Sequence, residues 1–151
     1  MGSIAPALPI GVVAGLRSML APAAVSWAAR SHSPSLRNTP LAFLGYPAIR
    51  WLLTGLAVAE LIGDKLPGAP SRKSPVAFGG RLATGAFSGA AIGIGRNSAL
   101  GGLAGGVMGA ALGTLGGFAA RRAVARRLGA DWQAALIEDA FAAGLLVGAL
   151  R

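Results

Sequence analysis

The sequence predicts an all-α membrane protein: a polytopic bundle of about five transmembrane helices that forms a single transmembrane domain over residues 1–151. Two observations favour this fold class. Hydrophobic residues make up 54% of the chain and charged residues only 13%, whereas a soluble domain carries about 25% charged residues. Long apolar segments also follow one another, separated by short basic or Pro/Ser-rich stretches. That alternation is typical of a chain that crosses a membrane repeatedly.

Five segments approach the roughly 20 mostly apolar residues that a membrane-spanning helix needs. We predict these helices over residues 8–29, 41–62, 76–94, 98–119 and 132–150. The second segment is interrupted by Gly45, Tyr46 and Pro47, which divide it into a short interfacial piece and a spanning piece. A bundle of four spans is therefore the alternative to five.

Pro22 lies inside the first of these segments. A proline removes one helical hydrogen bond, here the bond to the carbonyl of Ser18, and so predicts a kink just after Arg17. A break at this depth either borders a cavity or is a tolerated kink, and the sequence leaves both alternatives open.

Basic residues are distributed unevenly between the loops. The two loops that follow the second and fourth segments hold Lys65, Arg72, Lys73, Arg121, Arg122, Arg126 and Arg127. The remaining loops hold Arg30, Arg37 and Arg96. Because cytoplasmic loops of membrane proteins collect Lys and Arg, we predict a multi-pass protein of the bacterial inner (cytoplasmic) membrane with a cytoplasmic N-terminus. The net charge of +9 then belongs to these loops, and we expect no nucleic-acid partner.

The chain has 24 glycines, and some of them recur at a regular spacing of four residues. The fourth segment repeats glycine every four residues at Gly101, Gly105, Gly109, Gly113 and Gly117. Shorter series occur at Gly85, Gly89 and Gly93 and at Gly11 and Gly15. A four-residue step keeps such positions on one slowly drifting helix face, where another helix can approach backbone to backbone as in a glycine zipper. That face serves either packing within one subunit or a homo-oligomer interface, and both stay open here.

Ionisable residues inside the apolar segments are the candidate functional site. Counting about 1.5 Å per helical residue, five of them fall in the cytoplasmic half of the membrane: Arg17, Glu60, Arg81, Glu138 and Asp139. An unpaired charge at mid-bilayer costs at least about 2.5–3.5 kcal/mol. We therefore expect Arg17 and Arg81 to pair with some of the three acids, facing the bundle interior.

Charges near the segment ends have simpler interpretations. Asp64 and Lys65 are expected at the solvated end of the second helix, since charges near helix ends reach out to the interface. A second candidate set for lipid headgroups or an anionic ligand consists of Lys65, Arg72, Lys73, Arg121 and Arg122. Such basic clusters attract anionic lipid, and the alternative is ordinary positive-inside charge.

Signals for an enzyme are sparse. The chain has no cysteine and a single histidine, His32, so thiolate and multi-histidine metal sites are excluded. No G-x-S-x-G or H-E-x-x-H motif is present. We predict no metal site, no cofactor and no catalytic residue, although paired carboxylates for a hydrolysis are not ruled out.

Several stretches together resemble one family. They are Gly15-Leu16-Arg17-Ser18, A-E-L-I-G-D-K-L-P from Ala59 to Pro67, A-A-R-R, and A-L-I-E-D-A. They are similar to the short bacterial membrane proteins grouped as domain of unknown function 4126, over most of the chain. The resemblance implies an integral inner-membrane protein with a charged E-x-x-x-D-K-x-P element and implies no activity. This chain has P-S-R-K where longer members carry an acidic stretch.

Three functional hypotheses follow from these patterns. The first is a small homo-oligomeric transporter or channel whose site is the charged network of Arg17, Glu60, Asp64, Arg81, Glu138 and Asp139, because intramembrane ionisable residues usually mark a pathway. The second is a non-transporting scaffold or assembly protein whose charges only lock the fold. The third is a lipid-phosphate-binding or lipid-modifying protein. Membrane lipids are expected partners in all three.

Overall fold

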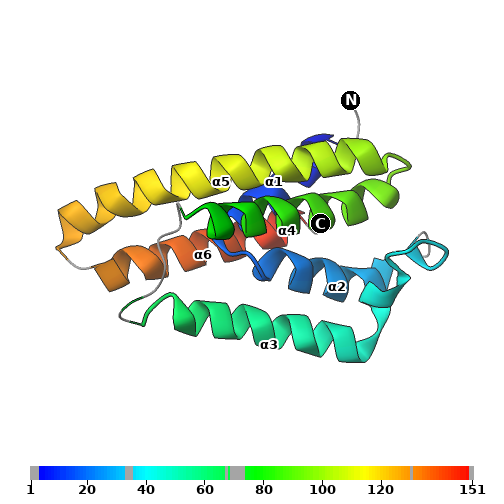
Figure 1. Cartoon of the computed structure of the whole chain (residues 1–151), viewed down its shortest axis with the longest axis horizontal. Helices are drawn as coiled ribbons and strands as arrows, with labels where there is room; N and C mark the ends of the chain where they lie inside the picture. Colours follow the sequence, from blue (N-terminus) through cyan, green and yellow to red (C-terminus); the bar gives the residue numbers. More distant parts are fainter. Residues whose placement is uncertain (1–3, 33–35, 67, 69–73, 130, 150–151) are drawn as a thin grey trace.

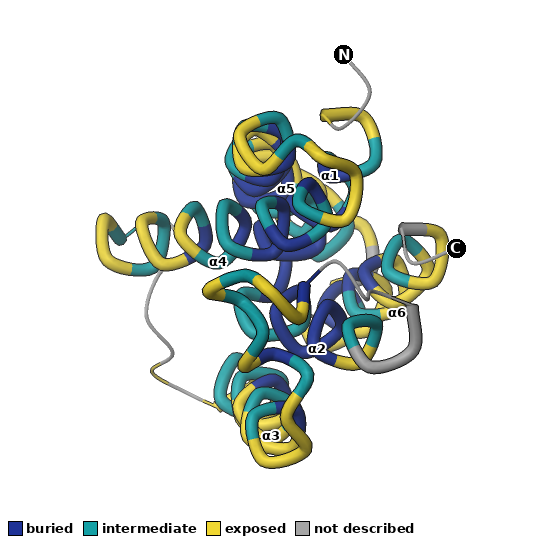
Figure 2. Tube along the Cα trace, turned by 90° about the vertical axis from the view of Figure 1, so that its right-hand side faces the viewer, coloured by how far each residue is buried: buried dark blue, intermediate teal, exposed yellow. Residues whose placement is uncertain are grey.

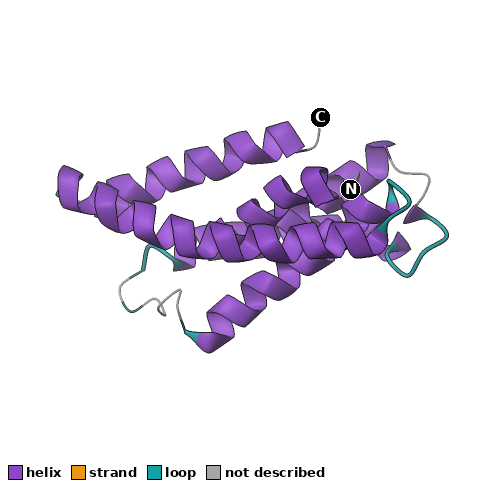
Figure 3. Cartoon of the chain, turned by 90° about the horizontal axis from the view of Figure 1, so that it is seen from above, coloured by secondary structure: helices purple, strands orange, loops and turns teal. Residues whose placement is uncertain are grey.

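The computed structural model describes residues 4–32, 36–66, 68, 74–129 and 131–149, and within them the chain is all-α, as predicted. The elements are α1 (Ile4–Leu16), α2 (Leu20–His32), the short 3₁₀-helix η2 (Ala42–Gly45), α3 (Pro47–Gly63), α4 (Pro75–Ile94), α5 (Ala99–Leu128) and α6 (Asp131–Ala149). Figure 1 shows them in this order, and Figure 3 shows helices laid lengthwise along the molecule with loops toward its ends.

The prediction of one helix over residues 8–29 is wrong. The segment forms two helices, α1 and α2, separated by Arg17, Ser18 and Met19. The break precedes Pro22, which is the third residue of α2. The predicted kink just after Arg17 is therefore a complete break. In the first turn of a helix the missing N–H of proline has no helical partner to lose, so Pro22 fits the start of α2.

The chain reverses direction at this break. Helix α1 runs parallel to α5, since Leu8 lies beside Gly109 and Val12 beside Gly113. Helix α2 runs antiparallel to α3, since Met19 contacts Glu60 while Trp27, farther along, contacts residues early in α3. Helices α3 and α5 run in the same direction in Figure 1. The first apolar segment is therefore a helical hairpin that turns back inside the bundle.

The other predicted segments correspond more closely to single helices. The second is divided before Pro47, so that η2 precedes α3, and a proline in the first helical turn fits that start. Helix α4 begins after Ser74, whose side chain accepts a hydrogen bond from the N–H of Ala77. Helix α5 has 30 residues, about 45 Å at 1.5 Å each, and ends at Gly129 with φ of 72°, a left-handed conformation suited to glycine.

Glycine-rich α5 is the central helix of the core, with α1 and α4 packed on two of its faces. A Cβ added at Gly109 would lie 2.8 Å from the backbone nitrogen of Val12 in α1 and closer still to the carbonyl oxygen of Leu8. On another face, an added Cβ at Gly106 would collide with the backbone of Gly85 in α4. Figure 2 shows the buried stretches toward the middle of the bundle and exposed turns around its periphery. These glycines therefore pack helices together within one chain.

The length and composition of the helices bear on the five predicted spans. Among the described residues, one helix, Ala99–Arg127, is long and apolar enough to cross a membrane, and two shorter apolar helices are Ile4–Leu16 and Leu20–Ala29. The all-α fold is confirmed, whereas the membrane bundle of five spans stays a prediction.

The packing of α5 against α1 predicts opposite effects of one substitution at two glycines. Gly109→Ala should lower the free energy of unfolding by about 1–3 kcal/mol, because the new methyl group meets backbone atoms that cannot move aside. Gly116 in the same helix has nothing within 4 Å of an added Cβ, so Gly116→Ala should be neutral or stabilise by up to about 1 kcal/mol. Denaturant unfolding of the purified protein in detergent measures both, and equal effects would contradict this packing.

Candidate polar site at the helix break

Arg17, the first residue of the break, is buried to 1% exposure and is the largest fully buried side chain of the described residues. Its Nε donates a hydrogen bond to Oδ1 of Asp139 in α6 at 2.7 Å. Its Nη2 contacts the same carboxylate, and its Nη1 contacts Asp64 at the end of α3. The expected pairing of Arg17 with one of the three acids is present, through Asp139, and the ion pairs of Arg17 join the break to α3 and α6.

Lys65 is exposed just after the end of α3, as expected, whereas Asp64 is only partly exposed and forms an ion pair. Asp64 is 24% exposed and pairs with Arg17. Lys65 Nζ lies 3.1 Å from Oδ2 of Asp139 and 3.2 Å from the carbonyl oxygen of Leu61. The rule for helix ends misjudged Asp64 because it treats a helix in isolation, whereas here the end of α3 meets the break at Arg17.

Glu60 binds backbone rather than an arginine. Its Oε1 accepts a hydrogen bond from the N–H of Ser18 and its Oε2 one from the N–H of Met19, both at 2.8 Å. These N–H groups precede the first turn of α2, where helical amides lack internal partners and the helix dipole favours negative charge. Glu60 therefore caps the start of α2 with both carboxylate oxygens.

The other open end of the break is held by a cation. The carbonyl oxygen of Gly15, near the end of α1, accepts hydrogen bonds from Arg81 Nη1 at 3.1 Å and from Thr114 Oγ1 at 3.2 Å. Arg81 is 5% exposed. Carbonyls at a helix C-terminus carry partial negative charge and attract cations. Both ends of the broken helix are thus held by side chains of the appropriate charge.

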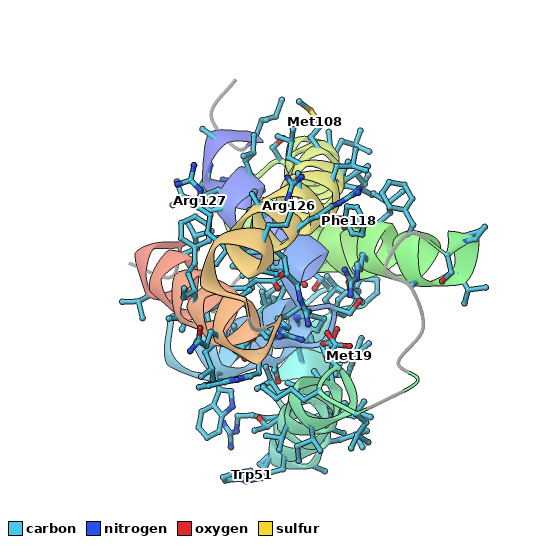
Figure 4. All side chains as sticks on the ribbon, turned by 90° about the vertical axis from the view of Figure 1, so that its left-hand side faces the viewer. Met19, Trp51, Met108, Phe118, Arg126 and Arg127 are labelled. Atoms are coloured by element: carbon cyan, nitrogen blue, oxygen red, sulfur yellow. The ribbon has the colours of Figure 1, made fainter. Side chains whose placement is uncertain are left out.

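Glu138 and Asp139 diverge, as expected for neighbours about 100° apart on a helix. Asp139 faces Arg17, whereas Glu138 is buried and places Oε2 3.9 Å from Nη1 of Arg121 in α5. The chain has five acidic residues, and four of them take part in these contacts. Figure 4, seen from the end at which α3 and α5 finish, shows nitrogen and oxygen atoms between the helices near Met19.

The predicted basic set for lipid headgroups is divided by the structure. Lys65 belongs to the ion-paired cluster, and Arg121 lies beside Glu138. Arg122 is exposed on the same helix. Arg72 and Lys73 lie outside the described residues. Of the predicted packing glycines, Gly105, Gly109, Gly113 and Gly117 contact α1, and Gly101 is partly buried.

One buried cation was not assigned a role from the sequence. Arg50 in α3 is 5% exposed, and its guanidinium carbon lies 4.5 Å from the centre of a Trp27 ring. Its Nε and Nη1 have no hydrogen-bond partner, so the ring provides its attraction. The sequence does contain a signal for this residue: Arg50 lies inside an apolar segment, and an arginine there needs a partner.

No protein-family model matches the chain, and neither does any curated protein or solved structure. The resemblance around Ala59–Pro67 therefore stays a prediction. In the described part of the chain, no group of three His, Asp or Glu side chains is arranged to hold a metal ion. The polar groups of the site take part in ion pairs and in hydrogen bonds to the backbone.

The contacts of Arg17 predict a large loss of stability when its side chain is removed. Arg17→Ala should lower the free energy of unfolding by about 3 kcal/mol or more, because breaking a buried pair leaves Asp64 and Asp139 without their common cation. Adding Asp139→Asn to Arg17→Ala should recover part of that loss, since one of the two carboxylates that lose Arg17 is then neutral. Unfolding of both variants in detergent measures the difference.

Arg96, which is exposed in the turn between α4 and α5, provides the matched control. Arg96→Ala should change the free energy of unfolding by less than about 0.5 kcal/mol, as surface substitutions usually do. An Arg17→Ala protein as stable as Arg96→Ala would refute the structural role of these ion pairs.

Proposed function

We propose that the chain is a small multi-pass protein of the bacterial inner membrane that transports a small solute or ion through the polar site at the α1–α2 break. The observation that carries this proposal is the broken helix itself, with Glu60 on the amides of one open end and Arg81 on a carbonyl of the other. Secondary transporters use discontinuous helices whose ends face substrates and coupling ions. Irregular backbone at membrane depth is tolerated where it is buried in protein or lines a cavity.

The distribution of side chains supports a membrane environment. The interior contains charged and small residues, with Arg17, Arg50 and Arg81 buried. The periphery exposes large apolar side chains, among them Trp51, Leu52, Leu100, Met108, Leu112, Trp132 and Phe141. A soluble protein buries most of its large apolar side chains and exposes most of its charged ones. In a bilayer, ionisable residues face the bundle interior and apolar residues face lipid.

The hairpin of α1 and α2 changes the side of the membrane on which we place the start of the chain. The positive-inside rule still places Arg121, Arg122, Arg126 and Arg127 on the cytoplasmic side. Ile4, at the start of α1, lies beside Gly105 in the first part of α5, whereas these arginines lie in the last part of that helix. The predicted cytoplasmic N-terminus assumed that the first segment crosses the membrane once. Because that segment turns back, the proposal now places Ile4 on the non-cytoplasmic side.

The ion pairs suggest how a charged solute would act at this site. Arg17 is shared between two carboxylates, and Asp139 is shared between Arg17 and Lys65. An anion competes with Asp64 or Asp139 for the guanidinium, and a cation competes with Arg17 or Lys65 for a carboxylate. Either exchange loosens the contact between the break and α3 or α6, and that contact closes the site in this conformation.

A homo-oligomer remains part of the proposal, since a small bundle encloses little space alone. The glycine face at Gly105, Gly109 and Gly113 is not available for it, because α1 covers that face within the same chain. A second copy would use an exposed apolar face, such as the one on α3 with Trp51, Leu52 and other large side chains. The mass of the detergent-solubilised particle measures the oligomeric state.

A non-transporting scaffold is the second candidate. It is favoured by one observation, namely that Arg17, Glu60, Asp64 and Asp139 all have partners in the structure, as charges that only lock a fold would. Under this alternative the chain moves no solute and co-purifies with a stoichiometric foreign membrane protein.

Transport through the site predicts a flux that depends on Glu60. The purified protein, reconstituted in sealed liposomes, should pass protons, alkali cations, chloride or a small organic ion, followed with encapsulated indicators. Glu60→Gln should lower the flux about tenfold or more, the effect of 1.4 kcal/mol, because a neutral amide holds the amides of Ser18 and Met19 less strongly.

Arg96→Gln is the matched control for Glu60→Gln and should transport at the wild-type rate, because its side chain is exposed in the turn between α4 and α5 and is not part of the break. Folded wild-type protein that passes none of these solutes would refute the transport proposal and favour the scaffold.

A further inference from the structure

Arg50, the fourth residue of α3, is a buried cation that forms no ion pair within the described part of the chain. The chain has five acidic residues, and four of them make the contacts described above. Glu60, the acid nearest in sequence, lies ten residues farther along α3, about 15 Å away by helical rise. The fifth acid, Asp131, begins α6 just after α5 ends, at the end of the bundle where α3 also finishes (Figure 1). The positive charge of Arg50 therefore has no counter-charge at its own end of α3.

The guanidinium of Arg50 also lacks hydrogen-bond acceptors. The residue is 5% exposed, and its Nε and Nη1 are buried without a hydrogen-bond partner among the described residues. The buried residues of α3 are Arg50 and Ala57, two helical turns apart, so Arg50 lies on the face of α3 that protein covers. A buried charge whose N–H groups have no acceptor is costly, and an aromatic ring attracts the charge without supplying acceptors. Two donors are therefore open to a ligand here.

Trp27 covers this guanidinium and is itself held in place by other residues. Its ring centre lies 4.5 Å from Cζ of Arg50. Its Nε1 donates a hydrogen bond to Oγ1 of Thr54 at 3.1 Å, and the ring of Trp51 meets it edge-on with 5.4 Å between the ring centres. Thr54 Oγ1 in turn donates to the carbonyl oxygen of Arg50 at 2.8 Å. The surroundings of the guanidinium are thus fixed before a ligand arrives, which lowers the cost of binding one.

The position of Arg50 along α3 indicates from where a ligand reaches it. By helical rise it lies roughly 6 Å beyond Tyr46, the residue that precedes α3. The exposed aromatic residues at this end of the α2–α3 pair are Trp27, Phe43, Tyr46 and Trp51. Tryptophan and tyrosine are enriched at the membrane–water interface. In the proposed membrane, Arg50 therefore lies near the level of the lipid phosphates on the side opposite the basic end of α5, where soluble ions also reach it.

We propose that Arg50 binds a phosphate group, carried by a phospholipid headgroup or by a soluble ion, with Trp27 as one wall of the site. N–H groups on two nitrogens of a planar guanidinium point in different directions, so two acceptor oxygens satisfy them and a single halide ion does not. Guanidinium groups bind phosphate oxygens in pairs of parallel hydrogen bonds. A second copy in the same membrane orientation offers no acid here, because its Asp131 lies at the opposite end of the bundle. The inference does not need the chain to transport, so a failure of the flux experiment leaves it standing.

The test is a titration of the lipid-free full chain in uncharged detergent with sodium phosphate, at an ionic strength held constant with sodium chloride. Replacing the exposed Trp132 by Phe leaves Trp27 and Trp51 as the two tryptophans of the chain, so their fluorescence reports the site. Phosphate should change that fluorescence saturably and, at ten times its Kd, raise the melting temperature by about 3 °C. A parallel titration with dissolved short-chain phosphatidylglycerol separates the two sources, because the ligand with the lower Kd is the one that supplies the phosphate group.

Arg50→Met removes the guanidinium and keeps an unbranched apolar stem in its place. Because no ion pair is broken, this variant should melt at or above the wild-type temperature without phosphate, and its affinity for phosphate should fall about tenfold or more. Arg96→Met is the matched control, since Arg96 is exposed in the turn between α4 and α5 at the same end of the bundle, and it should bind phosphate as the wild type does. If Arg50→Met does not fold, Arg50→Lys replaces it. That variant keeps the charge without the planar fork and should bind phosphate about tenfold more weakly.

Three results would overturn the proposal. In the first, neither ligand changes the tryptophan fluorescence of the folded wild-type chain. In the second, Arg50→Met binds phosphate as tightly as Arg96→Met does. In the third, Arg50→Met converts an oligomer to monomers while phosphate has no effect, and Arg50 then contacts a second copy of the chain. Phosphate binding that is present in the wild type and in Arg96→Met and lost in Arg50→Met supports the proposal.

Discussion

The structure depends on how one buried guanidinium, that of Arg17, is neutralised. Taking a charge out of water costs several kcal/mol even after relaxation, and only close, well-placed partners offset it. Arg17 obtains those partners from Asp64 at the end of α3 and Asp139 in α6, two elements that approach it from different sides. The relative positions of α3, α6 and the hairpin are thereby fixed at one point, because any arrangement that separates them leaves charges buried without partners.

The break in the helix and the charges around it require each other. An interrupted helix exposes amides and carbonyls that cost free energy in an apolar interior. Glu60 takes the amides of Ser18 and Met19, and Arg81 takes the carbonyl of Gly15. Conversely, a continuous helix over this segment would leave the Glu60 carboxylate without these donors. The helix break and the charged residues Glu60 and Arg81, which lie far apart in the sequence, therefore form one hydrogen-bonded arrangement.

What could be predicted from the sequence follows from which interactions are local. The boundaries of α4 were recoverable because Ser74 and Pro75 form a local start signal, and Arg17 was recognisable as needing an acid. The hairpin of α1 and α2 could not be predicted, because hydropathy measures how apolar a segment is and carries no information about chain direction. Asp64 was misjudged for a related reason: its partner is 47 residues away, and only the packing of α3 on the break brings the two together.

The packing divides the bundle into two parts, which bears on the proposed transport. Helices α1, α4 and α5 touch backbone to backbone through glycines, which leaves no side chains between them that could rearrange. Helix α3 lies at the periphery and packs mainly on α2 (Figure 2). Near the site, polar contacts hold α3 to the break and to α2. Asp64 pairs with Arg17, and Glu60 accepts hydrogen bonds from the amides of Ser18 and Met19. Polar contacts can exchange with a charged solute, whereas glycine packing cannot, so opening of the site would begin between these two parts.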